Sequence, residues 1–244
     1  MPKSFSARAF VGLVLMAGGG LFALAMLNPN STGSLRFVCF LVVGCLAARL
    51  KVKLPGISGS MSVNLPFILV AAAQMSAAEA LVIGCISTSV QCLVTGRKFN
   101  PVQVAFNFAN MALAITATRA IFNSGAVSAS IASPSLRLAL ATAGFFLVNT
   151  IPVAIIISLT EKAGVLRTWA GMFQLSFPYY IASAGISAAL LTLNGRIGWE
   201  TPLAVLPLMA GIVHSYRRYF NDPSRAGQRE TQPQAVPQAA KASV

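Results

Sequence analysis

Long apolar segments recur along almost the whole chain, and they constrain its fold more than any other feature. Hydrophobic residues make up 56% of the 244 residues and charged residues only 9%, whereas a soluble domain has about 25% charged residues. Segments of this length and polarity are typical of helices that cross a bilayer. The alternating pattern of a membrane β-barrel is absent from the sequence. The sequence therefore predicts an all-α polytopic membrane protein.

Eight apolar segments are expected to form one bundle of about eight transmembrane helices. They span residues 10–26, 35–48, 63–74, 77–94, 101–122, 136–159, 169–193 and 202–215. The third is short, because a crossing helix needs about 20 residues. It fits either one tilted half of a helical hairpin or a re-entrant segment that closes at "QMSAAE".

Lysine and arginine are distributed unevenly between the two sides that eight crossings would create. Fourteen fall on one side, and four fall on the other: Arg36, Arg119, Arg137 and Arg196. Positive residues mark the cytoplasmic side, so we expect a multi-pass protein of a bacterial cytoplasmic (inner) membrane with both termini in the cytoplasm. The segregation would be lost if the third segment did not cross. The positive residues behind the net charge of +13 are thus expected to orient the chain in the lipid bilayer. They are not expected to bind nucleic acid, because no stretch outside the membrane is long enough to form a nucleic-acid-binding face.

Two regions of different composition follow one another along the chain. Residues 1–220 are predicted to form the transmembrane domain. Residues 221–244 are rich in Pro, Gln, Ala and Ser without apolar periodicity, which predicts a disordered cytoplasmic tail. Lys3 and Arg8 before the first apolar run resemble the start of a signal peptide, but more spans follow, so an uncleaved first helix is expected.

The side chains that usually carry catalysis are scarce. The five acidic residues map to loops, to the end of a span or to the tail, and the lone histidine, His214, lies at the predicted end of the last span. One histidine cannot supply a metal cluster, and a proton relay would need a carboxylate within the membrane. We therefore predict no catalytic residue, no metal, no cofactor and no enzymatic activity.

Side-chain amides are concentrated in "FNPVQVAFNFANMALAI", residues 99–115. Asn100 followed by Pro101 predicts a helix start, and Gln103 has the spacing of a capping box. Asn107 and Asn110 lie deeper, at roughly 9 and 14 Å along the helix from Pro101. Because an unpaired amide is costly in lipid, their face must turn toward protein or a water-filled cavity.

Two other segments carry polar groups to a similar depth. Asn149 lies in "FLVNTIPVAI", where Pro152 frees the carbonyl of Val148, and Tyr179 lies in "FQLSFPYYIASAG", where Pro178 frees the carbonyl of Gln174. These groups either form hydrogen bonds between helices or line a ligand pocket. The candidate ligand-binding residues are Asn107, Asn110, Asn149, Gln174 and Tyr179.

Several segments resemble a known kind of bacterial membrane region. "GRKFNPVQVAFNFANMALA", "FFLVNTIPVAI", "FPYYIASAGISAAL" and "GWETPLAVLPLMAGIVHSYRRYF" occur in the order found in the MASE-type membrane-associated sensor regions that precede HD-type phosphohydrolase or GGDEF diguanylate cyclase domains. "LPGISGSMSVNLPFILVAAA" is similar too, so the resemblance covers roughly residues 50–220. It implies a sensory input module whose last helix leads into a cytoplasmic effector. This sequence departs from the pattern, because only the tail follows "SYRRYF".

Three functions are compatible with these observations. The first is a non-enzymatic membrane sensor that binds an unknown small or lipidic ligand and acts through a separate cytoplasmic effector protein. The second is the membrane component of a small-molecule, vitamin-like transporter, and the third is a structural membrane protein. The resemblance favours the sensor.

Overall fold

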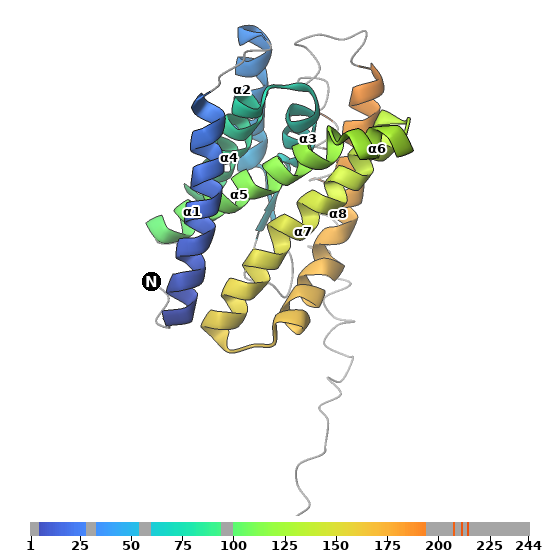
Figure 1. The fold of residues 1–244 in the computed structure, drawn as a ribbon. Helices are drawn as coiled ribbons and strands as arrows, with labels where there is room; N and C mark the ends of the chain where they lie inside the picture. Colours follow the sequence, from blue (N-terminus) through green and yellow to red (C-terminus); the bar gives the residue numbers. More distant parts are fainter. Residues whose placement is uncertain are drawn as a thin grey trace, which may run out of the picture.

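The computed structural model describes residues 5–27, 33–53, 60–93 and 100–193, together with the single residues Pro207, Gly211 and His214. In these ranges the elements are α1 (Phe5–Leu27), α2 (Ser34–Arg49), β1 (Lys51–Lys53), β2 (Ser60–Ser62), α3 (Leu65–Gln74), α4 (Ala77–Leu93), α5 (Pro101–Phe122), α6 (Gly125–Ser130), α7 (Pro134–Glu161) and α8 (Val165–Leu193). The helices pack into one bundle, in which α5 crosses between α1 and α7, and α7 and α8 lie side by side (Figure 1).

The helical architecture predicted from sequence is confirmed, and several of the described helices could cross a membrane. Three described helices, α1, α5 and α7, are long and apolar enough to cross a membrane, and α8 is a fourth if its two bent halves form one span. Helices α2, α3 and α4 are shorter than these. Eight crossings therefore stays a prediction, and the tail at 221–244 and most of the segment 202–215 lie outside the described residues.

Asn100 and Pro101 start α5 as the sequence predicts. α5 begins at Pro101, and the Asn100 side-chain oxygen accepts hydrogen bonds from the Val102 and Gln103 backbone N–H groups, at 3.2 and 3.4 Å. Asn100 and Pro101 thus need no further function. Two smaller elements were not predicted: the antiparallel pair β1–β2, which pairs Lys51 with Ser62, and the short helix α6.

The short third segment forms a helical hairpin with α4. Ser76 and Glu79 form a reciprocal capping box at the turn: the Glu79 N–H donates to Ser76 Oγ at 3.2 Å, and the Ser76 N–H donates to Glu79 Oε2 at 3.1 Å. α3 is buried on all sides from Leu65 to Ala72, because α4, α5 and α8 surround it. A helix of ten residues is about 15 Å long, half the thickness of a bilayer core of about 30 Å.

The C-terminal end of α3 is held by arginine side chains. Arg119 on α5 donates through Nη1 to the carbonyl oxygens of Ala72 and Met75, at 2.8 and 2.6 Å. Arg36 on α2 donates to the Gln74 side chain at the same helix end. A cation at this position satisfies carbonyl groups that have no partner within the helix and complements the negative end of its dipole.

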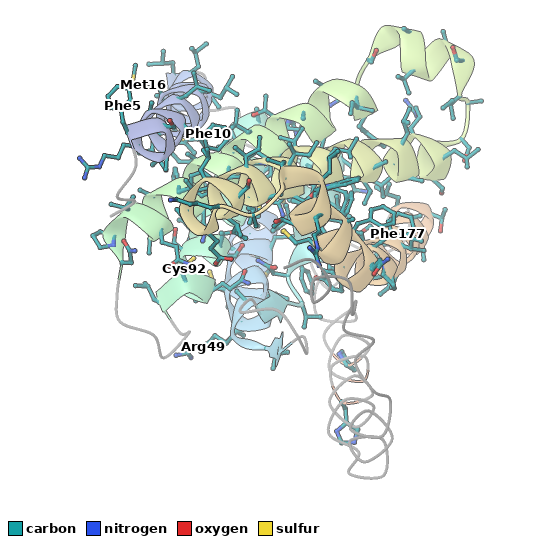
Figure 2. All side chains as sticks on the ribbon, turned by 90° about the horizontal axis from the view of Figure 1, so that it is seen from below. Phe5, Phe10, Met16, Arg49, Cys92 and Phe177 are labelled. Carbon is teal, nitrogen blue, oxygen red and sulfur yellow. The ribbon has the colours of Figure 1, made fainter. Side chains whose placement is uncertain are left out.

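The outer surface of α1 is apolar and suits contact with lipid. Phe5 and Met16 are 86% and 80% exposed and point away from the bundle (Figure 2). The opposite face of the helix packs on α5 through Val11 and Val14, and Gly18 lies directly against the Ala109 backbone. A small residue such as Gly18 at the contact permits this close approach between two helices in a membrane.

We expect Gly18→Ala to lower the free energy of unfolding by about 1–3 kcal/mol, because an added Cβ would overlap the Ala109 carbonyl. The matched control is Gly19→Ala, where an added Cβ meets nothing within 4 Å and a better helix former replaces glycine. Unfolding in mixed micelles of increasing SDS fraction measures both. Equal stabilities for the two variants would refute this account of the α1–α5 contact.

Arg119→Met should also destabilise the protein, by about 1–3 kcal/mol, because two carbonyl oxygens at the end of α3 lose a charged donor. The control Arg137→Met removes a cation that lies 5.3 Å from the Phe122 ring centroid, a contact worth about 0.5–1 kcal/mol. The same SDS titration compares them. If Arg137→Met proved the more damaging, the proposed role of Arg119 would be wrong.

Candidate functional site

A chain of hydrogen bonds joins α5, α7 and α8 inside the bundle. The Asn110 side-chain nitrogen donates to the backbone oxygen of Asn149 at 2.9 Å and to its side-chain oxygen at 3.1 Å. The Asn149 side-chain nitrogen donates to the Tyr180 hydroxyl at 2.9 Å. Asn110 is 2% exposed and Tyr180 8%. We call these three residues the amide–tyrosine network.

The backbone carbonyl of Asn149 fixes the direction of every bond in this network. A carbonyl oxygen only accepts, so the atom of Asn110 that faces it must be the nitrogen. The same nitrogen is 3.1 Å from one side-chain atom of Asn149, which must therefore be the oxygen. The Asn149 nitrogen then faces Tyr180. These contacts determine which amide atom is oxygen and which is nitrogen in both Asn110 and Asn149.

Aromatic rings from α7 and α8 surround the tyrosine end of the network. The Phe146 ring centroid lies 4.8 Å from that of Tyr180 in an edge-to-face arrangement, and Phe145 lies 6.1 Å away. Phe146 also contacts Phe173 and Phe177. Phe177 is 39% exposed and is visible at the outer side of the bundle (Figure 2). The aromatic cluster therefore extends from the buried network to the outer surface of α8.

Both helices that carry the aromatic cluster contain proline. Pro152 follows Asn149 by three residues in α7, and Pro178 precedes Tyr180 by two in α8. The segments Val165–Gln174 and Ser176–Thr192 of α8 meet at 50°. The bend lies about one turn before Pro178, whose ring removes a backbone hydrogen bond of the helix. The network thus lies beside helix segments whose backbone bonding is incomplete.

A second polar contact region holds the buried start of α3. The Tyr179 hydroxyl accepts from the Leu65 N–H at 3.3 Å, and Ser187 Oγ donates to the Pro66 carbonyl at 3.2 Å. The Asn64 side-chain nitrogen donates to Ser87 Oγ on α4 at 3.1 Å. These bonds supply partners for backbone and amide groups that would otherwise lie unsatisfied in the bundle. Successive tyrosines of α8 therefore serve different contacts.

The five candidate residues do not all come together. Asn110 and Asn149 meet as predicted from their depth. Asn107 is half-buried and donates to Cys92 Sγ on α4 at 3.2 Å, Gln174 is exposed, and Tyr179 contacts α3. Asn107 and Asn110 are three positions apart and were expected to face the same way. They contact different neighbouring helices, Asn107 contacting α4 and Asn110 contacting α7.

Sequence reasoning missed Tyr180, the third member of the network. A signal for it was present: Phe173, Phe177 and Tyr180 are spaced four and three residues apart, which places them on one face of a helix. That face packs on α7 through Phe146. The choice of Tyr179 rested on depth alone, which cannot tell adjacent tyrosines apart.

The chemistry available to the network is hydrogen bonding by neutral groups. Within the described ranges no three His, Cys, Asp or Glu side chains are grouped so as to hold a metal ion. Amides and a tyrosine hydroxyl can recognise a molecule by donor and acceptor positions, and the aromatic rings can contact its apolar part.

The MASE9 family model matches residues 22–215, well over half of the chain. The chain belongs to the MASE9 family. MASE9 is a MASE-type membrane-associated sensor domain family, so the resemblance seen in the sequence is confirmed. The match includes α5, α7 and α8, which carry the amide–tyrosine network of this MASE9 domain. No curated protein and no solved structure matches the chain.

A double-mutant cycle tests whether the network of this MASE9 domain is energetically coupled. We expect Tyr180→Phe to lower the free energy of unfolding by about 0.6–1.7 kcal/mol in the wild type, as a hydrogen bond between membrane helices does. In an Asn149→Leu background the same change should have little effect, because the donor to the hydroxyl is already gone.

The matched control for this cycle is Tyr179→Phe. Its hydroxyl accepts from the Leu65 N–H rather than from Asn149, so its effect should be the same in both backgrounds. SDS-induced unfolding measures all six proteins. A Tyr180→Phe effect that did not change between backgrounds would contradict the coupling.

Proposed function

We propose that this MASE9 domain is a non-enzymatic membrane sensor that binds a small or lipidic ligand at the amide–tyrosine network. The observation that carries the proposal is the network itself. It joins three helices through neutral polar groups at 2.9–3.1 Å, in a member of a membrane-associated sensor family.

The surroundings of the network support a role in signalling. A ligand that changed the bonding of Asn149 would act on α5 and α8 together, since its amide contacts Asn110 on one and Tyr180 on the other. The bend in α8 and the two prolines lie within a few residues of this point. Helix segments with fewer backbone hydrogen bonds shift at lower cost. Binding would thereby alter the packing between α7 and α8.

The output of such a sensor is proposed to pass to a separate cytoplasmic effector protein. The orientation with both termini in the cytoplasm of a bacterial inner membrane is part of the same proposal. Its support is the segregation of fourteen Lys and Arg residues from the four on the opposite side. Of these four, Arg36 and Arg119 bond to residues at the C-terminal end of α3. Arg137 lies over the Phe122 ring at the end of α5.

Native mass spectrometry of the full chain in nanodiscs tests ligand binding. We expect the wild type to retain a molecule from the total lipid and metabolite extract of the host cell. The fraction occupied should fall about tenfold or more in Asn149→Leu, because at least one hydrogen bond is lost. The control Tyr179→Phe should retain it.

Hydrogen exchange and transport assays separate the sensor from the other two functions. A sensor should show altered amide exchange in α7 and α8 when the extract is added, without solute flux in proteoliposomes. Flux across the membrane would favour a transporter component. Neither a retained molecule nor any exchange change would favour a structural protein and refute the sensor proposal.

A further inference from the structure

One atom of the amide–tyrosine network has no hydrogen-bond partner within the described chain. It is the side-chain oxygen of Asn110. Asn110 is 2% exposed, so bulk water does not reach this oxygen freely. A buried acceptor without a donor is destabilising, and native structures rarely leave one without a bound water, ion or other partner.

The orientation of Asn110 cannot be reversed to remove this problem. Turning the amide would place its oxygen 2.9 Å from the Asn149 carbonyl oxygen, so that two acceptors would face each other. The nitrogen must stay where it is, and the oxygen keeps its unfilled acceptor position. Whatever occupies this position must therefore offer an N–H or O–H donor.

The other end of the network has the complementary property. The Tyr180 hydroxyl accepts from Asn149, and among the described residues its own proton meets no acceptor. Every bond in the network is directed from Asn110 toward Tyr180. The network therefore ends in an unfilled acceptor at Asn110 and an unused donor at Tyr180.

We infer that the ligand of this MASE9 domain is an uncharged molecule whose hydroxyl or N–H group donates a hydrogen bond to the side-chain oxygen of Asn110. The inference rests on the proposed function and specifies the chemistry of its ligand. Carboxylates and phosphates fail the requirement, because they present only acceptors to Asn110 and their charge would be costly to bury. Ketones, ethers and oxidised quinones fail it at this position, because they lack a donor.

The aromatic cluster indicates the rest of the molecule. Phe145 and Phe146 pack against Tyr180, and Phe146 continues the cluster to Phe177 at the outer surface. These rings lie at the tyrosine end of the network, so a ligand that extends from the Asn110 oxygen toward Tyr180 needs an apolar or aromatic body there. The ligand class is thus a membrane-soluble alcohol, phenol or amide.

Phenol and anisole test the requirement for a donor, because they differ by the methyl group that replaces the hydroxyl proton. The thermal unfolding midpoint of the full chain in nanodiscs is followed by tryptophan fluorescence, with each probe at equal membrane concentration. Phenol at about ten times its Kd should raise the midpoint by about 3–6 °C. Anisole should bind about tenfold more weakly and give a smaller rise.

Two variants assign the difference to Asn110. In Asn110→Leu, which keeps a similar shape but has no acceptor, phenol and anisole should shift the midpoint equally. Asn107→Leu is the matched control one turn earlier on α5, where the amide donates to Cys92 rather than to the network. It should keep the preference for phenol. If Asn110→Leu does not fold, Asn110→Ala replaces it and should likewise respond equally to phenol and anisole, because it too has no acceptor at this position.

The inference fails if phenol and anisole shift the wild-type midpoint equally, or if anisole is preferred. It also fails if Asn107→Leu loses the preference, or if Asn110→Leu retains it. A wild type that responds to neither probe would indicate a permanently bound water at the Asn110 oxygen and overturn the inference as well. The sensor proposal would survive each of these results if native mass spectrometry still found a molecule that Asn149→Leu loses.

Discussion

A polar group inside a membrane bundle must find its partner in the protein or in a molecule bound to it, because lipid offers none. Asn149 meets this requirement in three ways. Its backbone carbonyl and its side-chain oxygen accept from Asn110, and its nitrogen donates to Tyr180. The backbone carbonyl cannot change its role, so it sets the orientation of both amides. The contact between α5, α7 and α8 is therefore directional, whereas the apolar packing around it is not.

The same requirement shapes the α3–α4 hairpin. α3 by itself is too short to cross a bilayer, and its start at Leu65 is buried within the bundle. Tyr179 binds the backbone at its start, and Arg119 binds the carbonyls at its end. α8 consequently contacts the start of α3 through Tyr179 and the network through Tyr180. A movement of α8 would change both the Tyr179–Leu65 contact and the Tyr180–Asn149 contact.

Sequence reasoning was most successful where the controlling physics is local. The start of α5 at Asn100 and Pro101 was predicted because capping depends on residues two or three positions away. Helix positions followed from apolar length, and the membrane family was recognised from the order of its segments. Of the five candidate residues, Asn110 and Asn149 are in contact, while Asn107, Gln174 and Tyr179 lie elsewhere. Depth along a helix can be counted from sequence, but rotation about its axis cannot.

The sequence by itself determined a helical membrane protein with amides in the interior, since hydropathy and length decide where a segment is stable. Only the tertiary structure decided which amides pair. Asn107 and Asn110 are one turn apart, yet one contacts Cys92 on α4 and the other Asn149 on α7, because α5 lies between these helices. The tertiary structure also decided that Tyr180, rather than its neighbour, completes the network. A rotation of about 100° per residue sends adjacent side chains to different partners, and only the packing of α8 fixes which partner each one meets.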